Sequence, residues 1–496
     1  MPIIYDEKKR VFKLDTPNTT YAFHVTNSNH LLHLYYGASI PETDITHMLR
    51  IPNDEPFVPS THDGMGPHSF DCAAIEFPTS GVADFREPCM QLMDKYGMSA
   101  CECYYDSCAI YKGKKKLEGL PATYANTDDE VTSLEVYCKD PHNGLEITLQ
   151  YSVFEKLDVI TRSVKVKNGG ADPIELRRLL SACVELDSKD YDMITLYGTW
   201  ARERHVQRNP LHFGKQLVDS CRGATSHAHN NFIAIVDHKA TEDYGDCYGF
   251  ALCYSGSFVA GCEVNQYEKT RVFSGINPYD FSWHLDLGEE FQAPEVIMVF
   301  SASGIGTMSR TFHDVMRNNL TRGKWKDIRR PILINNWEAT YFNFDTDKLL
   351  DIARESAKAG IEMLVMDDGW FGHRNDDKSS LGDWFVNEDK IKGGLKHLVD
   401  EVNKLGLKFG IWFEPEMISP DSELYKAHPD WCIHIPGRPR TTCRSQLVID
   451  FSRKDVRDYI YGQMYKILSS ANIEYVKWDM NRQLCEVGNE VLPPER

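Results

Sequence analysis

Four short apolar segments in the last third of the sequence each end in acidic, amide or indole side chains. The segments are Pro331–Trp337, Met363–Met366, Lys408–Phe413 and Ile473–Val476. Helix-like stretches separate them and no hairpin turn joins any two, so we expect parallel strands connected by right-handed crossovers. In an α/β barrel the carboxyl ends of such strands converge at the mouth, where catalytic groups lie. The pattern predicts about the first half of a (β/α)8-type barrel.

Polar and aromatic side chains mark the carboxyl ends of these segments. Asp367 and Asp368 follow the second segment, Trp412 lies near the end of the third, and Lys477 and Asp479 follow the fourth. Carboxylates accept hydrogen bonds from sugar hydroxyls, and indole faces cover the apolar side of a sugar ring. Adjacent carboxylates are costly without a donor or a cation nearby, and Lys477 is such a cation. The row of side chains predicts a site for a neutral polyol.

Each local motif also has a structural interpretation. Lys477 and Asp479 can form an ion pair with no chemical role. The Asp367-Asp368-Gly369 segment is also typical of an Asx turn. Trp200, far upstream, is either an exposed platform for a sugar ring or a core residue, and its local sequence favours the core. Local sequence alone decides none of these alternatives.

Residues 1–305 show a different pattern, in which short strands dominate and helical patterns are few. Leu145–Phe154 and Ile160–Lys167 are examples, and the second alternates branched and polar residues as a half-solvated strand does. Many short strands separated by turn residues predict a large antiparallel β-sandwich. We expect a helical linker at 306–328 and the barrel half at 329–496.

Charge and composition exclude several classes of partner. The formal net charge is -18, which argues against nucleic acid and anionic membranes because both require a basic face. No apolar run reaches membrane-spanning length, and the charged N-terminus is unlike a signal peptide, so we expect a cytoplasmic protein. The 14 cysteines are scattered, as in a reducing compartment. The one cluster, Cys101, Cys103 and Cys108, lacks a fourth ligand, and we expect neither a metal nor a cofactor.

The strand-end motifs closely resemble those of the large bacterial α-galactosidases of glycoside hydrolase family 36. The matching segments are Asn335–Thr340, Asp367–Trp370, Gly410–Glu416, His428–Trp431, Arg444–Asp450 and Lys477–Arg482. The N-terminal part is similar to that family's β-supersandwich, with Asp84–Arg86 and Trp200–Arg204 as matching points. The resemblance covers nearly the whole chain. It implies an exo-α-galactosidase that releases terminal α-1,6-linked galactose from melibiose- or raffinose-type oligosaccharides.

The resemblance also implies roles for the strand-end residues. Asp479 would be the nucleophile of a retaining double displacement, and Asp367 and Asp368 would bind the galactose 4- and 6-hydroxyls. Lys477 and Arg444 would contact ring hydroxyls near the point of attack. The other residues expected at the substrate site are Trp337, Trp412, Trp478, Asn481, Trp200 and Asp54. Trp200 and Asp54 would extend into the site from the N-terminal domain. In tetrameric relatives, the corresponding residues extend into the site of a neighbouring subunit.

Retaining hydrolysis requires a second carboxyl group about 5–5.5 Å from the nucleophile. The resemblance places that acid/base aspartate past Arg496, and neither Glu416 nor Glu486 matches it. We therefore expect an inactive or incomplete fragment of an enzyme that is a homo-oligomer, a tetramer by resemblance. Two alternatives stay open at this point: a non-catalytic galactose-binding or assembly subunit, and a transglycosylase of the raffinose- or stachyose-synthase type.

Overall fold

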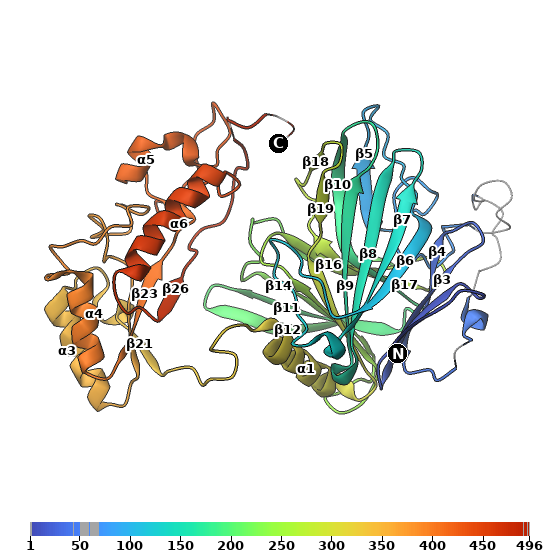
Figure 1. Ribbon diagram of the computed structural model, residues 1–496, viewed down its shortest axis with the longest axis horizontal. Helices are drawn as coiled ribbons and strands as arrows, with labels where there is room; N and C mark the ends of the chain where they lie inside the picture. The colour runs from blue at the N-terminus through green and yellow to red at the C-terminus, as the bar shows by residue number, and fades with distance from the viewer. Residues whose placement is uncertain are drawn as a thin grey trace. The chain divides into compact units, whose positions relative to one another are not determined.

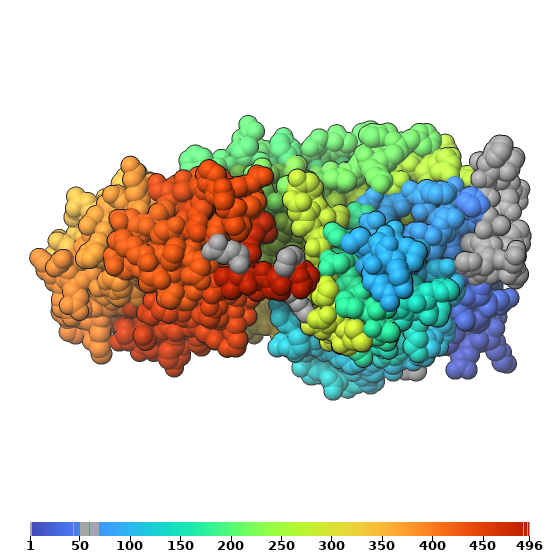
Figure 2. All heavy atoms as spheres, turned by 90° about the horizontal axis from the view of Figure 1, so that it is seen from above, coloured from blue at the N-terminus to red at the C-terminus, as the bar shows by residue number. Residues whose placement is uncertain are grey.

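The computed structural model describes residues 2–42, 44–49, 59, 69–489, 491–493 and 495. The chain divides into two compact units, with the division between Lys326 and Asp327. In the space-filling view, blue to yellow atoms form the first unit and orange to red atoms form the second, each closely packed (Figure 2). No helix in the described part of the chain is long and apolar enough to cross a membrane.

The first unit is built from three antiparallel sheets (Figure 1). One has four strands in sequence order: β1 (Ile3–Asp6), β2 (Val11–Asp15), β3 (Thr19–Val25) and β4 (Leu31–Ala38). A six-stranded sheet contains β13 (Gly214–Ser220), β16 (Phe258–Val264), β17 (Thr270–Ile276), β10 (Ile174–Leu186), β18 (Trp283–Leu285) and β5 (Met90–Met93). The ten-stranded sheet comprises β12 (Arg202–Pro210), β11 (Tyr191–Thr199), β14 (His229–Asp237), β15 (Cys247–Cys253), β20 (Glu295–Ser301), β9 (Val159–Asn168), β8 (Leu145–Phe154), β7 (Thr132–Asp140), β6 (Tyr104–Lys112) and β19 (Glu290–Gln292).

Alternation of side chains along these strands creates a continuous apolar core. In β8, Leu145, Ile147 and Leu149 are buried on one face, which is the period-two pattern of a strand with one solvated side. The antiparallel β domain expected from the sequence is confirmed. Helix α1 (Gly304–Val315) and the π-helical turn η4 (Met316–Leu320) follow the last strand.

The first unit also buries a cluster of charges. The Glu76 carboxylate pairs with Arg162 at 2.9 Å and accepts the hydroxyls of Tyr21 and Tyr151, both at 2.6 Å. His33 Nδ1 lies 2.9 Å from the other Glu76 oxygen. Burial raises the pKa of the Glu76 carboxyl, but the guanidinium and the other donors outweigh it, and the pKa is lowered overall. The carboxylate is therefore saturated with partners, as a buried charge requires.

The second unit is a parallel four-stranded sheet with helices between its strands. Its strands lie in the order β21 (Leu333–Asn335), β22 (Met363–Met366), β23 (Lys408–Phe413) and β26 (Tyr475–Trp478). Its main helices are α3 (Thr346–Lys358), α4 (Gly394–Lys404) and α6 (Lys454–Ser469). The shorter elements are α2 (Trp337–Thr340), α5 (Glu423–Ala427), β24 (Met417–Ile418) and β25 (Leu447–Val448). This confirms the expected partial α/β region.

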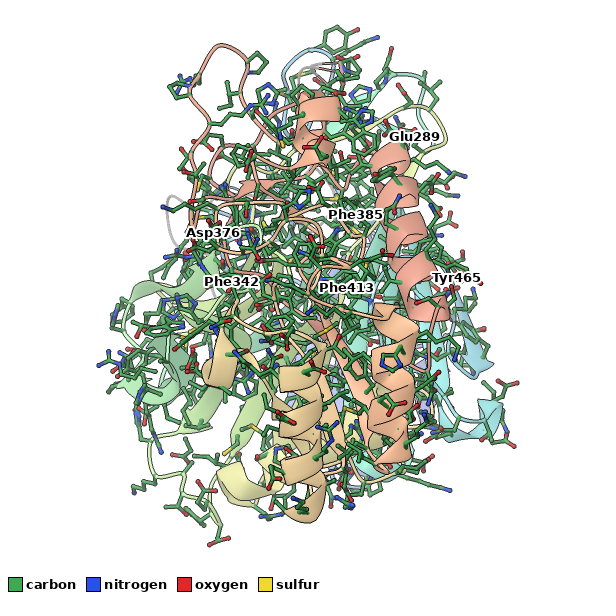
Figure 3. The ribbon with its side chains drawn as sticks, turned by 90° about the vertical axis from the view of Figure 1, so that its left-hand side faces the viewer. Glu289, Phe342, Asp376, Phe385, Phe413 and Tyr465 are labelled. Carbon is green, nitrogen blue, oxygen red and sulfur yellow. The ribbon has the colours of Figure 1, made fainter. Side chains whose placement is uncertain are left out.

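Local sequence explains where these helices begin and end. Asp345 caps α3 by accepting the backbone N–H of Lys348, as the sequence predicts for an N-cap aspartate. Gly360 follows that helix with a φ of 82°, a conformation that glycine adopts without steric cost. In Figure 3 the labelled Phe342 and Phe413 lie above helices α3 and α4, at the level of the loops that follow the strands. The carboxyl ends of the strands therefore face one set of loops.

Candidate active site

The carboxyl ends of β21, β22 and β26 meet at Asp367. Its side chain is almost fully buried, and Oδ2 accepts hydrogen bonds from Lys477 Nζ at 2.8 Å and from Asn335 Nδ2 at 2.5 Å. The backbone N–H of Asp367 donates to Asn336 Oδ1 at 2.8 Å. Because the strands are parallel, their carboxyl ends open on one side of the sheet, and Lys477 reaches Asp367 past the intervening strand β23.

Asp368 is held by a partner that the sequence did not reveal. Arg374 Nε and Nη2 donate to its two oxygens at 3.0 and 2.9 Å, and both side chains are buried. Burial raises the pKa of the Asp368 carboxyl and outweighs the lowering by Arg374, while Asp367 raises it further. Arg444 also lowers this pKa through its charge. The adjacent aspartates are thus compensated by two different cations, Lys477 and Arg374.

Asp479 lies directly after β26. Its backbone N–H donates to the carbonyl of Phe413 at 2.8 Å. Oδ2 accepts from Trp412 Nε1 at 3.1 Å and from Asn481 Nδ2 at 2.7 Å, whereas Oδ1 accepts the backbone N–H of Met480 at 3.1 Å. Side chains from two neighbouring strand ends therefore fix the orientation of this half-exposed carboxylate.

A third buried acid, Glu414, lies behind Asp479. Its carboxylate accepts the backbone N–H of Asn481, and Gln446 Nε2 donates to it at 3.1 Å. Burial raises the pKa of Glu414 to about 7, and the charges of Asp479 and Asp368 act in the same direction. Gln446 Oε1 is buried without a hydrogen-bond partner among the described residues. An amide in the flipped orientation would accept a hydrogen bond from a neutral Glu414 carboxyl.

The two glutamates considered as substitutes for a proton donor are engaged elsewhere. Both oxygens of Glu416 accept the indole N–H of Trp478, at 3.0 and 3.1 Å. Burial raises the pKa of the Glu416 carboxyl. Glu486 accepts the hydroxyl of Thr441, which lowers its pKa.

The expected tryptophans occupy different environments. Trp412 is only 1% exposed, and its ring packs in the core parallel to Phe371, with 6.0 Å between centroids, so it contacts the site through its N–H. Trp337, the first residue of α2, is half-buried beside Tyr341. Trp478 is 55% exposed.

The last two predicted site residues belong to the first unit of the chain. Trp200 is 83% exposed at the turn between β11 and β12, which rules out the core interpretation. Asp54 lies outside the described residues.

Arg444, in the second unit, is exposed. It and Ser445 both have a left-handed backbone, with φ values of 51° and 58°.

Sequence reasoning missed Arg374 and Gln446 as members of this cluster. Both lie in irregular segments, and no periodicity shows where a loop side chain folds back. Glu414 and Asn335 stood at strand ends in the quoted motifs, so their position was visible, but their partners were not. Four carboxylates, two cations and tryptophan side chains thus lie at the carboxyl ends of the strands of one parallel sheet. This arrangement is typical of glycoside hydrolases.

Comparison with known proteins places the chain in one family. Residues 29–286 match the glycosyl hydrolase family 36 N-terminal domain, and residues 290–496 match the melibiase family. The α-galactosidase AgaA of Geobacillus stearothermophilus is 48% identical over 100% of this chain and 68% of its own length. The chain belongs to glycoside hydrolase family 36, in its α-galactosidase class.

Solved structures of relatives agree with this assignment. The family 36 α-galactosidase AgaB of the same species superimposes with a TM-score of 0.97 at 47% identity, covering 100% of this chain and 68% of that one. A variant of AgaA in complex with raffinose superimposes with a TM-score of 0.96 at 48% identity, covering 98% and 68%. The chain thus spans about two thirds of the length of these relatives.

Proposed function

We propose that the chain binds terminal α-galactose of melibiose- and raffinose-type oligosaccharides and that Asp479 attacks the anomeric carbon in a retaining double displacement. The observation that carries this proposal is the clamping of Asp479 Oδ2 by Trp412 and Asn481, because a nucleophile must be held in one geometry. The crystal structure of the AgaA variant with raffinose supports the substrate class.

In the proposed reaction a carboxylate oxygen of Asp479 forms a bond to the anomeric carbon as the glycosidic C–O bond breaks. The leaving oxygen takes a proton, and water later hydrolyses the galactosyl ester. We assign the proton donor to neither Glu416 nor Glu486, because neither matches the position of the acid/base aspartate in the family.

The remaining assignments concern recognition. Asp367 and Asp368 would accept the 4- and 6-hydroxyls, with Lys477 and Arg374 as their cation partners. Lys477 and Arg444 would contact ring hydroxyls, with Trp337, Trp478 and Asn481 around the sugar, while Trp412 acts through its N–H on Asp479. Trp200 and Asp54 would be contributed by a neighbouring copy in a homo-oligomer, and the exposure of Trp200 is compatible with that role.

An activated aryl galactoside tests the nucleophile independently of the proton donor. Dinitrophenolate leaves without protonation, so the first step needs only Asp479. Incubation of the 496-residue chain with 2,4-dinitrophenyl α-galactoside should give a galactosyl adduct on the peptide containing Asp479, located by mass spectrometry. The matched glucoside should give none, because the equatorial 4-hydroxyl is misplaced for Asp367 and Asp368.

The control is Asp479→Asn, which preserves the shape and one acceptor oxygen of the side chain but removes the nucleophile. We expect loss of the adduct and galactose affinity within a few fold of the unmodified chain. Calorimetric binding of galactose without any adduct would instead support a non-catalytic galactose-binding subunit. An adduct on another carboxylate would refute the assignment of Asp479.

A further inference from the structure

Lys390 brings three backbone carbonyls of the second unit together. It lies in the irregular segment between β22 and α4, and its Nζ donates hydrogen bonds to the carbonyls of Phe342, Gly369 and Arg374, each at 3.0 Å. An ammonium group has three N–H donors. The protonated side chain therefore gives all of its donors to the backbone.

Two of these carbonyls lie at the ends of the segment 369–374, which follows Asp368. Gly369 is the next residue after Asp368, and Arg374 is the residue whose guanidinium donates to both Asp368 oxygens. The third carbonyl, that of Phe342, belongs to the loop after α2, the helix that begins with Trp337. The lysine therefore connects an aspartate, the cation partner of that aspartate and the loop beyond a tryptophan expected at the substrate site.

The segments that share Lys390 approach each other closely. Gly369 has a φ of 103°, and a Cβ atom there would lie 3.0 Å from Phe342 Cδ1 and 3.4 Å from the Arg374 carbonyl oxygen. Carbonyl oxygens that converge in this way carry like partial charges and repel each other. The ammonium group that they share offsets this repulsion, so an apolar side chain at position 390 should let the segments separate.

The backbone of Lys390 is itself fixed from two sides. Its carbonyl accepts the N–H of Thr346, the first residue of α3, at 3.0 Å. Asn387 accepts the Lys390 N–H through Oδ1 at 3.3 Å and donates its own N–H to the carbonyl of Trp370 at 2.9 Å. The lysine is therefore a fixed point for the segment 369–374.

Lys390 also adds positive charge near the aspartate pair. Burial lowers the pKa of its ammonium group, the negative charge of Asp368 raises it, and the charge of Arg374 lowers it again. Such charge effects weaken with distance, so the ammonium group lies near both members of the Asp368–Arg374 pair. Asp368 thus has one cation bound to its oxygens and a second that acts through its charge.

We propose that Lys390 is a positioning residue for galactose recognition. By holding the carbonyls at both ends of the segment 369–374, it keeps Arg374 on Asp368, and Asp368 in the geometry that one sugar hydroxyl requires. The lysine acts through the aspartate and touches no sugar atom. This inference rests on the proposed role of Asp367 and Asp368 in recognition, but it is independent of the nucleophile Asp479.

A thermodynamic cycle between residue and ligand tests this role. Calorimetry would compare galactose, 4-deoxygalactose and 6-deoxygalactose on the 496-residue chain and on its Lys390→Met variant. Galactose affinity should fall about tenfold or more. The penalty for removing the hydroxyl that Asp368 accepts should shrink at least about threefold, because a displaced carboxylate no longer binds that hydroxyl well. An identical penalty for each deoxy sugar in both chains would overturn the proposal, since a loss of stability alone weakens all three sugars by one factor.

Two further variants distinguish geometry from charge. Lys392 is exposed two residues further on, and Lys392→Met should change neither the affinity nor the penalties. Lys390→Arg keeps the positive charge, but a planar guanidinium cannot direct three N–H groups from one nitrogen. Its galactose affinity should stay at least about fivefold below that of the unmodified chain. Full recovery with arginine would show that charge alone suffices and would contradict the three-carbonyl geometry.

Hydrogen exchange gives a readout that needs no sugar. The Gly372 N–H donates to the carbonyl of Phe385 at 2.8 Å, and the Arg374 N–H donates to that of Phe371 at 3.2 Å. Both amides should exchange at least about tenfold faster in Lys390→Met, while exchange in β8 of the first unit should not change. Unchanged exchange at both amides would show that Lys390 does not hold this segment. Lack of galactose binding by the unmodified chain would instead refute the proposed function, whereas binding with equal penalties would refute only the role of Lys390.

Discussion

The two units bury carboxylates under opposite conditions. In the first unit, Glu76 is surrounded by Arg162, two phenols and His33, and its pKa is lowered. In the second unit, Asp368 and Glu414 are also buried, yet their pKa values are raised, Glu414 to about 7. The difference is the number of donors for each acid. Arg374 is the cation hydrogen-bonded to Asp368, and Glu414 accepts only amide N–H groups.

This contrast separates structural charges from charges that are available for chemistry. A saturated carboxylate cannot accept another hydrogen bond without losing one, whereas an undersaturated one gains from a ligand hydroxyl. Perturbed acids in a cleft are accordingly candidates for function. The four predictions that follow test the contrast, in order of decreasing effect.

Arg162→Met should have the largest effect on folding. It leaves the buried Glu76 carboxylate without its cation, which typically costs about 3–5 kcal/mol. The free energy of unfolding in urea measures the loss of stability, and hydrogen exchange in β3 and β9 shows where it occurs. The control Arg354→Met breaks an exposed pair with Asp351 and should change stability by less than about 0.5 kcal/mol. Equal effects of the two variants would remove the distinction between the saturated cluster and a surface pair.

Glu414→Gln should change the pH dependence of stability. Because the folded-state pKa of Glu414 is raised to about 7, the folded chain binds more protons than the unfolded chain between about pH 4.5 and 7. Stability therefore falls as pH rises through this window, by up to about 3 kcal/mol. The glutamine variant should show a flatter profile.

A suitable comparison for Glu414 is Glu362→Gln. The pKa of Glu362 is lowered by Arg329, so its contribution is present at neutral pH and lost as pH falls. Its removal should affect the acid side of the profile only. A slope between pH 4.5 and 7 that persists unchanged in Glu414→Gln would show that another group titrates there.

Lys477→Met should weaken galactose binding about 10- to 100-fold, as expected for loss of a charged hydrogen bond of about 1.5–3 kcal/mol. The lysine contacts Asp367 at 2.8 Å at the carboxyl end of the sheet. Lys408→Met is the matched control, because Lys408 pairs with Glu474 at the opposite end. Calorimetry on both variants decides whether the effect belongs to the strand ends or to any lysine of the sheet.

Trp412→Phe should give the smallest effect. It removes the indole N–H that donates to Asp479 and should slow galactosyl adduct formation about fivefold, corresponding to about 1 kcal/mol. Trp384 belongs to the same core cluster, but its Nε1 has no described partner. Trp384→Phe should therefore leave the rate unchanged, and equal slowing by both variants would point to packing rather than to the hydrogen bond.

Sequence patterns were informative where periodicity or a cap decides the structure. The strand Leu145–Phe154 and the cap Asp345 were predictable because each depends on residues adjacent in sequence, and the parallel direction of the four barrel strands was predictable from the alternation of strands and helices. The convergence of Asp367 and Lys477 was expected because the carboxyl ends of parallel strands lie on one side of the sheet.

Contacts made by loop side chains were not predictable, and neither were the buried polar atoms that have no hydrogen-bond partner. Arg374 folds back on Asp368 from an irregular segment, and Gln446 approaches Glu414 from the far side of a long loop. His33 Nε2 and the Tyr36 hydroxyl are buried without a partner among the described residues, and their placement depends on a register shift in β4, where Leu34 is an extra residue that forms a β-bulge. Such features depend on contacts between segments that are distant in the sequence, so they produce no periodic pattern in it.

The extra residue in β4 has a consequence for how the first unit can evolve. Because Phe23 pairs with His33 and Tyr21 pairs with Tyr36, loss of Leu34 alone would leave both side chains on the interior face. A strand of the present length that paired regularly from His33 onward would instead turn Tyr36 to the opposite face. The first unit can therefore lose this codon without turning either ring, but at its present length it depends on the bulge.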